Sequence, residues 1–240
     1  HRRSSAASDV YKRQANDRWT ALSLRARIIA VSKERVGKQA ITTIEDLASP
    51  KWQGRVCSRK GSHVYNRAVL ASLIAHNGEE AAKNWTLGLV DNLARRPQGN
   101  DRAQAKAIYS GQCDVALMNT YYYGKMKFAK DKPEQQKWAD SIEIAFFNQD
   151  SRGQHVNISA AGITQGSKRK ELARAFLEWV TSEEAQQIYT KVNFEYPVNP
   201  NAQLSEEVAS WGTFKMDMLP MNVIADNSPQ AQRIINETGW

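Results

Sequence analysis

The chain has 240 residues, of which 41% are hydrophobic, and its formal net charge at pH 7 is +8. This length allows one large domain or two small ones, and no apolar run approaches the roughly 18 residues that a membrane-spanning helix needs. The basic residues are scattered and do not form a stripe with interleaved aromatic side chains, so we expect no nucleic-acid partner.

The first residues, HRRSSAASDVYKRQ, do not have the pattern of a folded domain. They combine four Lys or Arg with one acid, lack apolar periodicity and contain no apolar run of the kind found in a secretory signal. We interpret residues 1–15 as a tail, either non-native adaptor sequence or a natural disordered segment. Without the charges of this tail the net charge falls to +5, which is only mildly basic.

Strands and helices alternate from Trp19 onward. We expect, in chain order, a strand at 20–31, a short helix at 43–47, a strand at 55–58, helices at 63–76, 79–89 and 100–111, and strands at 113–119 and 142–147. Ser62 and Asn100 are the expected N-caps of two of these helices. The continuous apolar run at 113–119 predicts a strand that is buried on both faces.

The last third of the chain continues the alternation with smaller residues. It predicts a strand at 155–163, helices at 168–181 and 183–190, and an extended segment at 196–198. Ser182 is the expected cap of the second helix. A final helix is expected to open with Ser228 as its cap and Pro229 at its first position. This order of elements predicts an α/β fold with a mostly parallel sheet.

The two cysteines, Cys57 and Cys113, each fall in an expected strand. Neither has a second Cys or a His at the spacing of metal ligands, so the sequence does not indicate a zinc site. Two buried free thiols and a disulfide in an oxidising compartment both fit this pattern. The sequence leaves the two possibilities open.

Three consecutive tyrosines, Tyr121, Tyr122 and Tyr123, directly follow the apolar strand at 113–119. Ligands of open α/β sheets bind beyond the carboxyl ends of the strands, which is where these side chains stand. Aromatic residues at such a place can also pack a helix onto the sheet. Successive residues point in different directions, so the three rings cannot all face a core. Position alone leaves a binding site and a packing role equally open.

Two further residues stand at helix starts that also follow strands. Tyr65 offers another phenol, although a single tyrosine there is more often a packing residue, and Asn100 is more often a plain cap. Several phenols at one edge favour a hard, highly charged cation, because Fe(III) prefers anionic oxygen ligands. A trivalent ion can displace the proton of a phenol whose free pKa is about 10.

The chain resembles the periplasmic ferric-iron-binding proteins of ABC importers, most closely the tyrosine-rich cyanobacterial type. The resemblance runs from about Asn16 to Trp240 and is carried by TIEDLASPKWQGRV, SHVYNRAVLASLIAHNGEEAA, RRPQGNDRAQ, NTYYYGK, RGQHVNISAAGI and FEYPVNP. It implies a monomeric solute-binding protein of the periplasm that carries Fe(III) to an ABC permease. It implies Tyr65, Tyr121 and Tyr122 as the iron ligands; Tyr123 is not assigned. Residues expected just outside the ligands are Ser62, Asn100, Asn119 and Lys125.

The resemblance also implies a type II periplasmic-binding-protein fold of two lobes. We expect residues 16–28 to form a crossover strand between the lobes, residues 29–152 one complete lobe that carries the tyrosines, and residues 153–240 the second crossover and the C-terminal part of the other lobe. The opening segment of the family's N-terminal lobe, which supplies further ligands, is expected to be missing. We place the hinge at residues 25–28 and 156–159.

Two other functions compete with iron carriage as interpretations of the sequence. The same fold can bind another solute, such as a polyamine, a thiamine-like cation or an oxyanion, because fold does not fix function. An enzyme is the weaker alternative, since the sequence lacks G-x-S-x-G, Walker, H-E-x-x-H and G-x-G-x-x-G motifs. His63, two residues before Tyr65, is expected to be solvated at its helix start.

Overall fold

A computed structural model describes residues 19–37 and 41–240, so the tail expected at residues 1–15 lies outside the described residues. The strands are Thr20–Ser32 (β1), Val56–Cys57 (β2), Val115–Asn119 (β3), Ile142–Ala145 (β4), Val156–Ala161 (β5) and Tyr196–Pro197 (β6). The longer helices are Val64–Asn77 (α2), Glu79–Asp91 (α3), Asp101–Tyr109 (α4), Thr120–Lys127 (α5), Pro133–Asp140 (α6), Lys170–Val180 (α7) and Met221–Thr238 (α10). Short helical segments are Glu45–Ala48 (η2), Pro50–Trp52 (η3), Glu183–Ile188 (α8), Tyr189–Asn193 (η4) and Glu206–Ser210 (α9).

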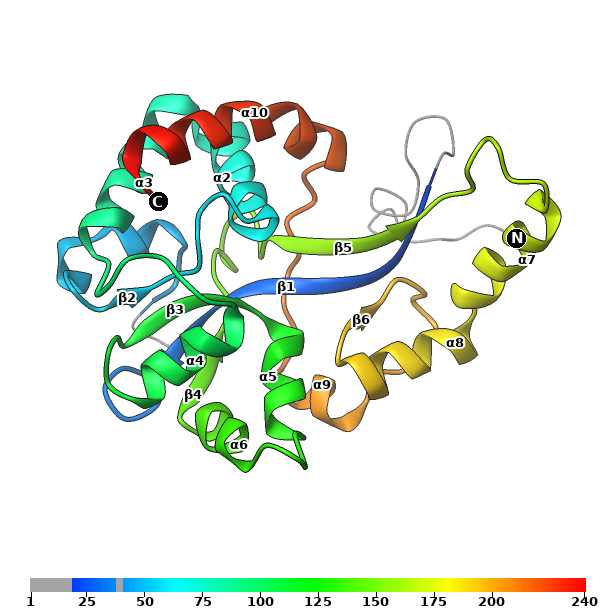
Figure 1. The fold of residues 1–240 in the computed structure, drawn as a ribbon, viewed down its shortest axis with the longest axis horizontal. Helices are drawn as coiled ribbons and strands as arrows, with labels where there is room; N and C mark the ends of the chain where they lie inside the picture. Colours follow the sequence, from blue (N-terminus) through cyan, green and yellow to red (C-terminus); the bar gives the residue numbers. More distant parts are fainter. Residues whose placement is uncertain (1–18, 38–40) are drawn as a thin grey trace.

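Strand β1 connects the two ends of the molecule. Its first half pairs with β5 and β6, with Arg25 opposite Asn157, and its second half pairs with β3 and β4, where Ile29 lies opposite both Leu117 and Ala145. Figure 1 shows β1 and β5 running side by side from the helices α2–α6 toward α7 and α8. A single long strand therefore links both ends of the fold.

The expectation of a mostly parallel sheet is wrong. Strand β1 is antiparallel to β3, β4, β5 and β6, and among the named strands only β2 and β3 pair in parallel. Because β3 and β4 both oppose β1, they share one direction with β2, as alternating strands and helices predict. The sequence pattern does not reveal that β1 enters the sheet from the opposite end.

Two hydrophobic clusters cover the two faces of this sheet. Alternation along β1 sends Ile29 and Val31 into the cluster under α2, α3 and α10, and Ile28 and Ala30 into the cluster under α4, α5 and α6. Strand β3 divides its side chains in the same way, and all five of its residues are buried. The prediction of a strand buried on both faces is confirmed.

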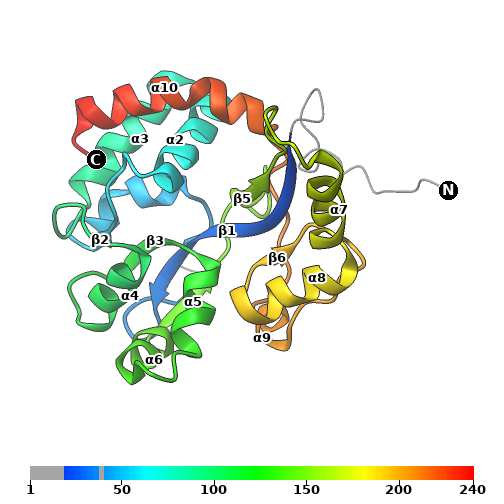
Figure 2. The same cartoon turned by 45° about the vertical axis from the view of Figure 1, so that its right-hand side comes forward.

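The C-terminal helix α10 packs against α2 and α3, although these helices are far from it in the sequence (Figures 1 and 2). Ile234 and Ile235 join the cluster under these helices, and the Trp240 indole donates a hydrogen bond to the Ser58 hydroxyl at 3.1 Å. The expected assignment of residues 153–240 to the second crossover and the other lobe therefore does not describe α10, which packs on the tyrosine-bearing part.

The predicted start of the last helix is also wrong. Helix α10 begins at Met221, and Pro229 lies inside it. The Ser228 hydroxyl does not cap a helix but donates to the Ile224 carbonyl within α10. Packing of the helix onto α2 and α3 outweighs the hydrogen bond that the proline removes. No helix in the described part of the chain has both the length and the apolar character to cross a membrane.

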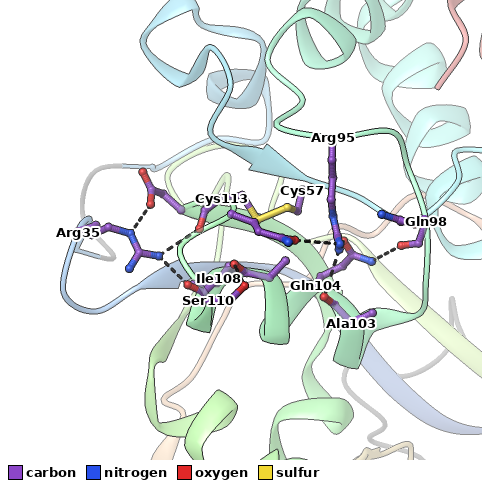
Figure 3. The surroundings of a disulfide bond; sticks show 12 residues. Arg35, Cys57, Arg95, Gln98, Ala103, Gln104, Ile108, Ser110 and Cys113 are labelled. Carbon is purple, nitrogen blue, oxygen red and sulfur yellow. Dashed lines mark hydrogen bonds and ion pairs between the residues drawn. A yellow bond between two sulfur atoms is a disulfide. The ribbon is translucent and has the colours of Figure 1, made fainter.

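The cysteines form a disulfide between Cys57, at the end of β2, and Cys113, just before β3 (Figure 3). The bond spans 56 residues of sequence. Arg35 and Arg95 lie on either side of it, and Arg35 donates to the Cys113 carbonyl at 3.1 Å. Of the two states that the sequence left open, the structure contains the disulfide.

Candidate metal site

The tyrosines stand at the starts of two helices. Tyr121 and Tyr122 lie in the first turn of α5, directly after β3, and Tyr65 is the second residue of α2, which follows β2. Because β2 and β3 pair in parallel, with Cys57 opposite Ala116, both helices begin at the same edge of the sheet. The sheet register thus brings together side chains that are more than 50 residues apart in the sequence.

The three phenols of Tyr65, Tyr121 and Tyr122 are in contact. The rings of Tyr121 and Tyr122 have centroids 4.2 Å apart, and the Tyr121 hydroxyl is hydrogen-bonded to those of Tyr122 and Tyr65. Burial raises the pKa of Tyr121 above its usual value, and these two hydrogen bonds raise it further. Without a cation, Tyr121 is therefore a neutral phenol at pH 7. The oxygen atoms from two elements converge on one point.

Three guanidinium groups surround the ring of Tyr65. The central carbons of Arg25, Arg27 and Arg59 lie 5.8, 5.7 and 5.4 Å from the ring centroid. Cations at this distance are attracted to the face of the ring. No sequence pattern marked these arginines as neighbours of the site. Arg27 could have been noticed, because it is a charged residue within the largely apolar sequence of β1.

Arg27 is the centre of a buried polar cluster that holds the helix starts together. Its side chain is fully buried and donates to Asp101 at 2.6 Å, Asn66 at 2.6 Å and Asn119 at 3.2 Å. Arg59 donates to the second oxygen of Asp101 at 3.0 Å. These partners belong to α2, to α4 and to the end of β3. We call Arg27, Asn66, Asp101 and Asn119 the Arg27 junction.

Tyr123 points away from the other two tyrosines of its run. Its ring contacts Trp211 edge-on at 5.9 Å and belongs to the cluster under α4, α5 and α6. Burial raises the pKa of its phenol. The run of three therefore divides: the rings of Tyr121 and Tyr122 lie against each other, and the ring of Tyr123 packs against Trp211.

The expected cap of α2 is corrected by the structure. Ser62 is exposed, and its side chain does not cap the helix. The N-cap is His63, whose Nδ1 accepts a hydrogen bond from the Tyr65 backbone N–H at 3.3 Å. Burial, followed by the charges of nearby arginines, lowers the pKa of His63, so this nitrogen is free to accept. His63 stands at the helix start as expected, but it is only partly exposed, and its ring centroid lies 4.5 Å from that of Tyr65.

The other residues expected near the ligands have different roles. Asn100 caps α4 by accepting from the Ala103 N–H at 3.1 Å, and Asn119 belongs to the Arg27 junction. The Lys125 ammonium lies 5.4 Å from the centroid of the Tyr121 ring. Asn119 and Lys125 are thus adjacent to the tyrosines, and Asn100 is fixed as a cap.

The donors at this site are phenol oxygens. Among residues 19–37 and 41–240, no group of three or more His, Cys, Asp or Glu side chains is arranged to hold a metal ion. A cation held by Tyr65, Tyr121 and Tyr122 would take three oxygen donors, the type that hard trivalent ions prefer. The residues present therefore fit Fe(III) better than a soft metal.

Comparison with known proteins points in the same direction. The family model for bacterial extracellular solute-binding proteins matches residues 4–216. Iron uptake protein A1 of Synechocystis is 40% identical over 230 residues, which cover 96% of this chain and 64% of that protein. A Trichodesmium structure in complex with iron and citrate has a TM-score of 0.93 at 37% identity, covering all of this chain and 77% of that one. A ferric binding protein from Campylobacter jejuni gives 0.90 at 38% identity, covering 98% and 76%.

These similarities confirm the predicted fold class, the two-lobed α/β fold of type II periplasmic binding proteins. The chain spans 64% of the length of iron uptake protein A1 and also 64% of that of iron uptake protein A2 of Synechocystis. The family match begins at residue 4, inside the segment interpreted from sequence as a tail.

Proposed function

The chain belongs to the bacterial extracellular solute-binding proteins, and on that premise we propose that it captures ferric iron through Tyr65, Tyr121 and Tyr122 and delivers it to an ABC permease. One observation carries the proposal: the Tyr121 hydroxyl is hydrogen-bonded to those of both other tyrosines, although they come from two helices. The names of the relatives, which are iron uptake and ferric-binding proteins, support the same cargo.

Capture is an exchange of protons for a metal ion. Each phenol that becomes a ligand releases its proton, and the trivalent charge of the cargo supplies the driving force. The three guanidinium groups around the Tyr65 ring place positive charge beside the anionic ligand set that forms when the ion arrives. The raised pKa of Tyr121 means that this ligand resists deprotonation until the ion is present.

Delivery requires the site to open. The paired strands β1 and β5, with Ala26 opposite Val156 and Leu24 opposite Ile158, join the tyrosine-bearing part to the region of α7 and α8. We place the hinge here, so that bending of these strands closes a second surface over the ion and a docked permease reopens it. The Cys57–Cys113 disulfide supports an oxidising compartment such as the periplasm as the place of action.

The test is a titration of the purified chain with ferric citrate while the visible spectrum is recorded. Iron bound to tyrosinate absorbs visible light, so a new band with a saturating amplitude is expected. Tyr121→Phe and Tyr122→Phe each remove one oxygen donor and keep the ring, and each should abolish or strongly weaken the band. Lowering the pH should weaken binding, because protons compete with the ion for the phenol oxygens.

Tyr123→Phe is the matched control. It makes the same chemical change in the next residue of the same helix, but that ring packs against Trp211. Its band should equal that of the unmodified chain. Undiminished ferric affinity in Tyr121→Phe or Tyr122→Phe would refute the ligand assignment, and a colourless unmodified chain would favour another solute, such as a polyamine, a thiamine-like cation or an oxyanion.

A further inference from the structure

The segment FEYPVNP, residues 194–200, has no role in the function proposed above. Its first residue, Phe194, has a backbone φ of 58° and lies in the left-handed region, directly after the π-helical turn η4. A bulky residue rarely adopts this conformation, so contacts in the folded chain must hold it there. The contacts of Phe194 therefore indicate what this segment does.

The backbone after Phe194 is fixed to β1. The buried Glu195 carboxylate accepts a hydrogen bond from the Ser23 hydroxyl, and Tyr196 pairs with Leu24 where β6 joins the sheet. Ser23 and Leu24 belong to the first half of β1, before the proposed hinge at residues 25–28. The segment is thus anchored on the side of the hinge away from the tyrosines.

The ring of Phe194 lies on helix α5, on the other side of the hinge. A Cβ atom at Gly124 would lie 2.7 and 2.8 Å from Cβ and Cδ1 of Phe194 and closer still to its Cγ, so only glycine leaves room for the ring. The ring also stacks on Phe128, with centroids 5.3 Å apart. Tyr121, Gly124 and Phe128 have the spacing of one helix face, so Phe194 packs on the face that begins with Tyr121.

A second contact across the hinge lies beside this ring. The Glu207 carboxylate of α9 accepts from the Lys127 ammonium of α5 at 2.7 Å and from the Trp211 indole at 2.8 Å. Figures 1 and 2 both show α9 beside α5. We call the contacts that Phe194 and Glu207 make with α5 the α5 clasp.

We propose that Phe194 is a positioning residue for the tyrosine site: its ring, seated against Gly124, fixes the first turn of α5 and holds the hinge closed. This inference rests on the proposed function. Helix α5 has eight residues, so a contact at its middle constrains the turn that carries Tyr121 and Tyr122. Because the α5 clasp spans the hinge, bending of β1 and β5 separates Phe194 from α5. An intact clasp therefore slows the loss of iron.

The experiment loads the chain with ferric citrate and follows the decay of the visible band after mixing with excess EDTA. Phe194→Ala should release iron roughly threefold to tenfold faster, the range that an aromatic pair contributes. It should also shift the wavelength of the band, which reports how the phenol oxygens are held and does not change with stability alone. Phe176→Ala makes the same chemical change on an exposed residue of α7 and should alter neither quantity.

Gly124→Ala tests the contact from the other side. Alanine is the better helix former, so this change would stabilise α5 if nothing lay against it, but the ring of Phe194 makes the new methyl group a wedge that should also speed release. In the Phe194→Ala background the same change should speed release by less than about twofold, because the wedge meets no ring. Gly166→Ala is the matched control, since a Cβ there would meet nothing within 4 Å.

Urea unfolding of the iron-free variants separates the α5 clasp from the iron site. The shift in the unfolding midpoint caused by Gly124→Ala should be smaller in the Phe194→Ala background than alone, and additive shifts would overturn the proposal. An unchanged release rate and band in Phe194→Ala would also overturn it, because the contact would then be packing alone. A colourless unmodified chain would refute the proposed function and with it the positioning role, whereas coupled unfolding shifts would still support the clasp.

Discussion

The Arg27 junction and helix α7 differ in how far their side chains are buried against the rest of the chain. The Arg27 side chain is fully buried, and it donates hydrogen bonds to three residues that come from three different elements. In α7, only Val180 is buried, while Leu172, Phe176 and Trp179 are 65%, 59% and 49% exposed. These three side chains are spaced along one face of the helix, as in any amphipathic helix.

The difference shows which parts of this fold depend on distant contacts. A charged group can be buried only where separate elements supply its partners, so the Arg27 junction requires β1, β3, α2 and α4 to be assembled. Helix α7 forms from its local pattern and packs little of its apolar face on the rest of the described chain. Stability should therefore be concentrated around the tyrosines, and the following substitutions test that.

Arg27→Leu should give the largest effect. It removes one partner of a fully buried ion pair, so that Asp101 keeps only Arg59 and the Asn119 N–H as donors and the Asn66 side-chain oxygen loses the guanidinium, which should lower the free energy of unfolding by about 3–5 kcal/mol. The measurement is equilibrium unfolding in urea. Arg233→Leu is the control, because its pair with Glu79 is about half exposed and should contribute less than about 1 kcal/mol. Equal losses of unfolding free energy in the two variants would mean that the buried Arg27 junction contributes no more to stability than an exposed ion pair.

The pH dependence of stability should also come from this region. His155 is buried, and its burial, followed by the charge of Arg27, lowers its pKa to about 3. Above about pH 6.5 the imidazole is neutral in both the folded and the unfolded chain. Below that pH the unfolded chain takes up a proton that the folded chain does not, so stability is lost as the pH falls from about 6.5 toward 3.

The expected loss is up to about 1.4 kcal/mol per pH unit, or about 2 kcal/mol between pH 6.5 and 5. His155→Gln should flatten this slope whatever it does to the absolute stability. Urea unfolding at several pH values between 7 and 5 measures it. An unchanged slope in His155→Gln would show that other groups control acid stability.

Much of the fold could be predicted from local patterns. The apolar run at 113–119 predicted β3, and the helix expected at 63–76 corresponds to α2 at Val64–Asn77. The errors fell where a distant contact overrides local chemistry. Pro229 remains inside α10 because that helix packs on α2 and α3, and the direction of β1 depends on partners far along the chain.

The site was predictable to a similar degree. Their place after strands left a site and a packing role open for Tyr65, Tyr121 and Tyr122, and only the resemblance to ferric-iron-binding proteins implied them as ligands, which stays a prediction. Their contact depends on the register between β2 and β3. The arginines around Tyr65 could not be found in this way. They come from β1 and from the segment after β2, and only the folded chain brings them to one ring.

The smallest effect is expected in α7. Leu172→Ser and Phe176→Ser replace side chains that are 65% and 59% exposed, so little apolar area returns to water on unfolding and stability should change by less than about 0.5 kcal/mol. Leu70→Ala in α2 is the contrasting change, since Leu70 is fully buried and its truncation should cost about 2–5 kcal/mol. A loss above about 1.5 kcal/mol from either α7 variant would mean that this apolar face is covered in solution, and the contrast between the two regions would then fail.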